Sequence, residues 1–161
     1  MGGGGYVRVI GLIKNKRTIL YLKQDYIEQD HPNLFKYKVI LPKANGSGAL
    51  GEVISTPLIG EPLIGYTETF IGIGAFDTRE EAEAALKYIK TKFARAMLGI
   101  LKVTQENRKG KWKYVPLQDF TSSSDIDWSG TVAEIDEQLY RKYGLSQEEI
   151  NFIESHVKEM N

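Results

Sequence analysis

The stretch Thr78–Gln105, TREEAEAALKYIKTKFARAMLGILKVTQ, decides how we expect the chain to fold. Its apolar residues recur every three or four positions and therefore line one side of an α-helix. These residues are Ala82, Leu86, Ile89, Phe93, Met97 and Ile100. Thr78 and Glu81 have capping-box spacing, which lets hydroxyl and carboxylate bond the free amides of a first helical turn. The stretch predicts one long helix with a buried side.

The side of this predicted helix opposite the apolar residues is basic. At 100° per residue, it carries Lys87, Thr91, Arg95, Lys102 and Gln105. A cationic face is a candidate for contact with a polyanion. More hydrogen-bond donors lie in loops before the helix, so we expect the helix to be mainly a scaffold for those loops and a contact surface second.

Short β-prone runs on both sides of the helix predict a small, mostly antiparallel sheet packed on it. Tyr6–Ile13 and Thr18–Leu22 flank the polar run Lys14–Arg17, which predicts a hairpin with a basic turn. The other predicted strands are Leu34–Leu41, Glu52–Ser55, Tyr66–Gly74 and Lys111–Leu117, with paired turns across Thr56–Gly65.

Two short helices are predicted at the C-terminal end, where Thr131 with Glu134 and Ser146 with Glu149 repeat the capping-box spacing. The predicted fold is therefore α+β: a small antiparallel sheet on one long central helix, followed by a helical hairpin. We expect residues 1–5 (MGGGG) to be a cloning remnant or linker, 6–120 an α+β domain, and 121–161 a linker (Thr121–Ser124) with the hairpin packed on that domain.

Composition excludes several classes of site. The 161 residues include no cysteine and only two histidines, His31 and His156, so thiolate zinc sites and cysteine nucleophiles are absent. No apolar run reaches the ~20 residues of a membrane span, and we expect a cytoplasmic protein.

The zero net charge conceals a strong segregation of charge. Residues 1–120 hold 18 Lys/Arg against 12 Asp/Glu, whereas residues 121–161 hold 3 against 9. A basic body with an acidic end favours a polyanionic partner for the body. The alternative is that solvated faces merely differ in sign.

The segment Gly46–Gly51, GSGALG, matches the dinucleotide-binding pattern G-x-G-x-x-G. That site needs a helix directly after the glycines, whereas EVISTPLIGEP follows here, β-prone and interrupted by Pro57 and Pro62. We therefore interpret the segment as a binding loop in which Lys43, Asn45 and Ser47 supply polar groups.

Several segments resemble the C-terminal target-recognition region of large type II restriction–modification adenine-specific DNA methyltransferases. They are YKVILPKANGSGALGEV (Tyr37–Val53), IGEPLIGYTETFIGIGAFDT (Ile59–Thr78), YIKTKFARAMLGILKVTQ (Tyr88–Gln105), WKYVPLQDF (Trp112–Phe120) and IDEQLYRKYGLSQEEINFIESHVKEM (Ile135–Met160). The resemblance implies a module that recognises double-stranded DNA, fused behind a methyltransferase domain and sometimes a nuclease. S-adenosylmethionine is then the cofactor of the parent protein.

The catalytic motifs of that family are missing from this chain, including the (N/D)-P-P-(Y/F) motif that holds the flipped adenine. We therefore expect no catalysis by this chain alone and no cofactor or metal bound to it. The expected partners are double-stranded DNA and the N-terminal methyltransferase domain of the parent.

Residues with cationic or paired donor and acceptor groups are the candidates for DNA contact. They are Asn15, Lys16, Arg17, Lys36, Lys38, Lys43, Asn45, Ser47, Glu68, Lys87 and Arg95. Two alternatives stay open: a docking domain that packs on the catalytic domain without contacting DNA, and a nuclease or nucleotide-binding domain.

Overall fold

The computed structural model describes residues 5–14, 16–23, 33–42, 57–101 and 115–160. Across these residues the chain forms an α+β fold, as predicted. The strands are β1 (Tyr6–Ile13), β2 (Lys16–Lys23), β3 (Tyr37–Pro42), β4 (Leu58–Gly60), β5 (Ile64–Tyr66) and β6 (Phe70–Phe76). The helices are α1 (Arg79–Lys90), α2 (Lys92–Leu101), α4 (Val132–Lys142) and α5 (Gln147–His156).

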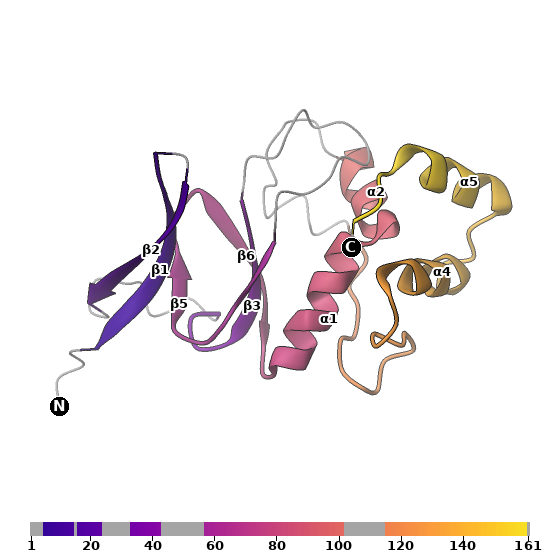
Figure 1. Ribbon diagram of the computed structural model, residues 1–161. Coiled ribbons are helices and arrows are strands. Elements are labelled where there is room, and N and C mark those ends of the chain that lie inside the picture. Colours follow the sequence, from indigo (N-terminus) through magenta and orange to yellow (C-terminus); the bar gives the residue numbers. More distant parts are fainter. Residues whose placement is uncertain (1–4, 15, 24–32, 43–56, 102–114, 161) are drawn as a thin grey trace.

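The strands form two three-stranded sheets where the sequence predicted one. In the first, of order β2-β1-β5, β1 pairs antiparallel with β2 and parallel with β5. In the second, of order β4-β3-β6, both pairings are antiparallel. The first sheet lies at one end of the molecule and α4 and α5 at the other, with the second sheet and α1 between them (Figure 1).

The two sheets meet through a small apolar cluster. Ile10 of β1 and Ile64 of β5 pack with Ile40 of β3 and Phe70 of β6. Beside the cluster, the Asn33 side-chain amide donates a hydrogen bond of 2.9 Å to the Tyr66 hydroxyl. The first sheet is therefore attached through β1 and β5, and β2 lies at its outer edge.

The predicted long helix is interrupted at Thr91, so the expectation of one continuous helix is wrong. Thr91 has φ −63° and ψ 151°, which ends α1. Its hydroxyl donates to the Tyr88 carbonyl at 2.6 Å and accepts from the Ala94 amide at 3.1 Å. Side-chain bonds of this kind compete with the helical ladder, which explains the break that the apolar period alone does not reveal.

The helix starts were predicted well because capping is a local property. The hydroxyls of Thr78, Thr131 and Ser146 each accept a hydrogen bond from the backbone amide three residues later. Ser146 and Glu149 form a complete capping box. Gly144 follows α4 with φ +60°, the left-handed conformation that glycine adopts without strain.

Other predicted elements shifted in position. The strand expected at Leu34–Leu41 begins at Tyr37, and the strand expected at Tyr66–Gly74 is divided between β5 and β6. Of the paired turns expected at Thr56–Gly65, the described residues 57–65 contain one, between β4 and β5. Of the strand expected at Lys111–Leu117, the described residues Val115–Leu117 are not in a strand, and Glu52–Ser55 lies outside the described residues.

One large core joins the second sheet to all four described helices. Its fully buried side chains include Val39 and Leu41 of β3, Phe93 of α2, and Ile135 and Leu139 of α4. Val115, Ile126 and Trp128, on either side of the expected linker, are buried in the same core. No helix within the described ranges combines the length and the apolar character needed to cross a bilayer.

Candidate nucleic-acid interface

The hairpin of β1 and β2, which we call the ribbon, is strongly basic. Tyr6–Lys23 contains Arg8, Lys14, Lys16, Arg17 and Lys23 and no Asp or Glu. The strands pair in continuous register from Tyr6 with Lys23 to Ile13 with Lys16, so two residues separate the paired strands along the chain. Almost every residue of β2 is exposed.

Each face of the ribbon has its own composition, because paired residues of antiparallel strands point to the same side. The Tyr21 face consists of Tyr6, Arg8, Ile10, Leu12, Arg17, Ile19, Tyr21 and Lys23. The Leu20 face consists of Val7, Val9, Gly11, Ile13, Lys16, Thr18, Leu20 and Leu22. The Tyr21 face therefore combines aromatic and cationic groups, whereas the Leu20 face is mainly apolar with one lysine.

The structure brings three of the predicted contact residues together near the ribbon's turn. Lys16 and Arg17 are exposed at the start of β2, and the Arg17 guanidinium lies 5.7 Å from the centre of the Phe70 ring. Phe70 directly follows the turn that holds the exposed Glu68. That turn lies against β1, because the Thr67 amide donates to the Ile10 carbonyl at 3.0 Å.

Lys36 lies away from the ribbon. It precedes β3, and its ammonium forms an ion pair with Asp77, just before α1. This pairing partly neutralises Lys36 and places it at the junction of the second sheet with α1.

Lys38 is not a surface cation, which contradicts its prediction as a DNA contact. Its side chain is fully buried in β3, and its Nζ donates to the carbonyls of Glu61 at 2.9 Å and Lys36 at 3.2 Å. Burial lowers the pKa of Lys38 to about 8. Alternation along the predicted strand Leu34–Leu41 puts Lys36 and Lys38 on one face, but it does not show that other segments cover that face of the second sheet.

Arg95 is buried and Lys87 is half-buried and bonded to backbone, so the described part of the predicted basic helix face is not open; Lys102 and Gln105 lie outside the described residues. Arg95 is 2% exposed, and its guanidinium donates to the carbonyls of Lys90 and Thr91 across the helix break. Lys87 donates to the carbonyls of Trp128 at 2.9 Å and Gly130 at 3.2 Å. These cations hold carbonyl groups where chain segments meet, and Thr91 between them is fully buried.

Four predicted contact residues, Asn15, Lys43, Asn45 and Ser47, lie outside the described residues. Three exposed ribbon cations were not listed among the predicted contacts: Lys14, which lies in the predicted basic turn, and Arg8 and Lys23, which lie along the strands. The signal that identifies them is the absence of acidic residues over the whole hairpin, whereas the prediction concentrated on its turn.

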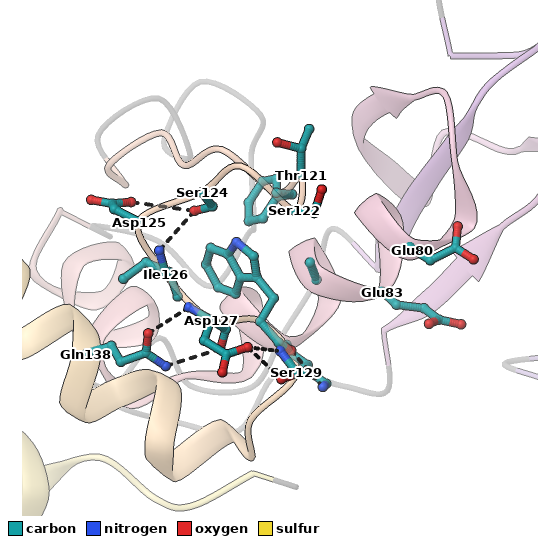
Figure 2. Close-up of a pocket in the computed structure, with 14 residues that line it drawn as sticks. Glu80, Glu83, Thr121, Ser122, Ser124, Asp125, Ile126, Asp127, Ser129 and Gln138 are labelled. Carbon is teal, nitrogen blue, oxygen red and sulfur yellow. Dashed lines mark hydrogen bonds between the residues drawn. The ribbon is translucent and has the colours of Figure 1, made fainter.

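A hollow with a volume of about 700 Å³ lies elsewhere, between α1 and the segment 120–129. Figure 2 shows Glu80 and Glu83 on α1 across from Asp125, Asp127 and Ser129, with Gln138 on α4. Phe120 and Trp128 supply aromatic walls and lie 5.1 Å apart between ring centres.

This hollow is electrostatically unsuited to nucleic acid. Hydrogen bonds from the hydroxyl and amide of Ser129 lower the pKa of Asp127, which therefore stays ionised at neutral pH. Four carboxylates line the hollow, and its one lysine, Lys87, is bonded to backbone carbonyls. A polyphosphate would be repelled here.

Within the described residues, no group of three or more His, Cys, Asp or Glu is arranged to hold a metal ion. His156 lies at the end of α5, where it stacks on Phe152 at 4.2 Å and bonds the Phe152 carbonyl. Of the described surfaces, the ribbon is therefore the one whose charge most clearly favours one kind of partner, a polyanion.

Comparison with known proteins adds no relative to this picture. No family model matches the chain, and neither the curated proteins nor the solved structures give a significant match.

Proposed function

We propose that the chain is a sequence-specific recognition module for double-stranded DNA, and that it belongs to a type II restriction–modification adenine methyltransferase or fused restriction enzyme. The resemblance of the sequence segments motivates the family. The observation that carries DNA binding is the ribbon: five cations, no carboxylate, and β2 exposed along its length.

The shape of the ribbon suits the proposed partner. The major groove of B-DNA admits a two-stranded β-ribbon, and neutralised phosphates supply most of the affinity. Lys14, Lys16 and Arg17 cluster at the tip, where they would meet phosphates and set the register. Glu68, on the neighbouring turn, could accept a hydrogen bond from the amino group of cytosine.

The proposal assigns no catalytic step to this chain. Methyl transfer from S-adenosylmethionine would belong to a separate domain of the parent, and so would extrusion of the target adenine. This chain would contribute affinity and sequence preference.

The proposal is tested by titrating the protein into a fluorescent 20-base-pair duplex and following anisotropy across a salt series. Replacing Lys14, Lys16 and Arg17 by glutamine should lower the steepness with which log affinity falls against log salt concentration, the salt slope, by about 2 to 3. Each lost phosphate contact contributes about 0.9 to this slope. A matched triple variant, Arg79→Gln with Arg141→Gln and Lys158→Gln, removes the same charge away from the ribbon and should retain the slope. No duplex binding at 20–50 mM salt, or equal losses in both variants, would overturn the proposal.

A docking domain is the second candidate, and the Leu20 face favours it. Ile13, Leu20 and Leu22 are 45%, 38% and 41% exposed on that face. Exposed apolar groups on one sheet face are a common protein-binding feature. Replacing Leu20 and Leu22 by serine would separate the two functions: DNA affinity should persist if the ribbon binds DNA, whereas assembly with a companion domain should weaken if this face docks.

A further inference from the structure

One end of the Tyr21 face holds an alternating square of two aromatic and two cationic side chains. In the antiparallel register Tyr6 pairs with Lys23, and Arg8 pairs with Tyr21. Each tyrosine therefore has a cation directly across from it and another two residues along its own strand. The two tyrosines are diagonal neighbours, about 7–8 Å apart by sheet geometry.

All four side chains of the square are free to meet a ligand. Tyr6 and Tyr21 are 64% and 65% exposed, far more than the other tyrosines of the described structure. Arg8 and Lys23 are exposed as well. Within the described residues, none of the four forms a side-chain hydrogen bond, an ion pair or a ring contact.

We propose that this square binds unpaired nucleotides of a nucleic acid, with bases stacked on Tyr6 and Tyr21 and phosphates held by Arg8 and Lys23. Aromatic rings beside a cationic track are the recurring chemistry of single-strand binding, because every base offers a π-face to an aromatic ring. Bases inside a duplex are stacked on each other and do not offer that face. Charge complementarity selects a polyanion, since the ribbon carries no carboxylate.

An apolar protein surface is the competing occupant of these rings, and the charges disfavour it. Arg8 and Lys23 alternate with the tyrosines and would have to be desolvated without a partner beneath such a surface. Binding of a second copy of the chain along β2 is disfavoured for a related reason. Antiparallel pairing of two β2 strands centred between Ile19 and Leu20 would set Lys16 of each copy opposite Lys23 of the other.

The inference rests on the nucleic-acid function proposed for the ribbon and adds a second mode of contact. Cations at the tip would serve duplex phosphates, while the square at the opposite end of the ribbon would take bases that have left the stack. A recognition module with both could hold DNA that is locally opened.

The experiment compares three fluorescent probes of equal length and label: a dT12 strand, a strand of twelve abasic nucleotides, and a 12-base-pair duplex. The abasic strand retains the phosphates and lacks the bases. We expect dT12 to bind at least about fivefold more tightly than the abasic strand, in line with ~1–3 kcal/mol for each stacked base. Equal affinity for dT12 and the abasic strand would overturn the inference.

Variants of the square then locate the site. Tyr6→Ala with Tyr21→Ala should weaken dT12 binding about tenfold or more and change duplex affinity less than twofold. Tyr6→Phe with Tyr21→Phe should retain dT12 binding, because stacking needs the ring and not the hydroxyl. The matched control Leu20→Ala with Leu22→Ala lies on the opposite face of the same strand and should leave dT12 binding intact.

The outcomes separate this inference from the proposed function. Duplex binding without dT12 binding would overturn the inference and leave the proposed function standing. Loss of both would overturn both. An unchanged dT12 affinity in the double alanine variant, with melting temperature confirming that it folds, would also overturn the inference.

Discussion

The carboxylate of Asp136 lies 2.9 Å from the backbone nitrogen of Phe93, 43 residues earlier in the chain. Its second oxygen accepts from the Lys92 amide at 3.0 Å. These amides open α2, so a side chain of α4 satisfies the start of a helix that its own sequence leaves without a carboxylate cap. Asp136 thereby connects the C-terminal helices to the helix break at Thr91.

Replacing Asp136 by alanine should destabilise the protein strongly. The change leaves two amides without their acceptor at a largely buried site, which costs about 1–3 kcal/mol for each group. We expect a loss of about 3 kcal/mol in the free energy of unfolding, measured by urea denaturation. Glu137→Ala changes the neighbouring exposed residue of the same helix and should stay within about 0.5 kcal/mol of the parent protein. Similar effects of the two substitutions would contradict the capping role.

The same carboxyl group should make stability depend on acidity. Burial raises the pKa of Asp136 to about 6, against the opposing effect of the bonds from the Phe93 and Lys92 amides. Between about pH 4 and 6 the folded protein holds a proton that the unfolded chain has released, so the free energy of unfolding should fall as pH rises. The fall should be on the order of 2 kcal/mol.

The check is the difference between parent and Asp136→Asn in urea denaturation from pH 4 to 7. Asparagine cannot titrate, so its stability should lack this component of the pH dependence. Parallel curves for the two proteins would show that Asp136 does not have a raised pKa.

Lys38 should produce the opposite trend at alkaline pH. The buried ammonium has a pKa of about 8, below the value of 10.5 expected for an unfolded chain. From about pH 8 to 10 the unfolded state binds more protons, so the free energy of unfolding should rise with pH. We expect a gain on the order of 2 kcal/mol between pH 7.5 and 9.5 that Lys38→Met lacks. Lys36→Met, two residues away and partly exposed, should retain the gain. Loss of the gain in both variants would show that the titrating group is not Lys38.

Gly72 of β6 should not tolerate a side chain. A Cβ there would lie 2.6 Å from the Asn33 side-chain nitrogen and collide with the Tyr66 hydroxyl, disrupting their hydrogen bond beside the junction of the sheets. We expect Gly72→Ala to lower the free energy of unfolding by about 1–3 kcal/mol in thermal or urea denaturation. Gly65→Ala in β5 meets Val9 at 3.6 Å, an ordinary contact, and should be milder. A Gly72→Ala protein as stable as Gly65→Ala would argue against this packing.

Much of the fold was predictable because it depends on neighbours in the chain. The caps at Thr78, Thr131 and Ser146 each join residues three positions apart, and the hairpin of β1 and β2 joins strands separated by two residues. The two-sheet arrangement was not predictable in this way. It depends on β5 pairing with β1, more than fifty residues earlier, through only three residues of register.

The same distinction between local and distant contacts applies to the candidate site. The basic character of the hairpin is a property of composition and follows from the amino-acid sequence alone, although only its turn was singled out. The burial of Lys38 and Arg95 and the internal hydrogen bonds of Lys87 do not follow from the sequence, because their periodicity places these residues on a polar face. In the folded protein, backbone carbonyls from distant segments or from the helix break accept their hydrogen bonds.

The α+β class, the helix starts and the positive charge of the hairpin therefore follow from the amino-acid sequence, since each depends on residues a few positions apart. Three features depend on the folded arrangement: the break of the central helix at Thr91, the capping of its second half by Asp136, and the bonds of three predicted contact cations to backbone carbonyls. These features cannot be predicted locally, because the burial of a charge depends on which distant segment covers it. A strand or helix period shows which side chains share a face, but not what that face meets.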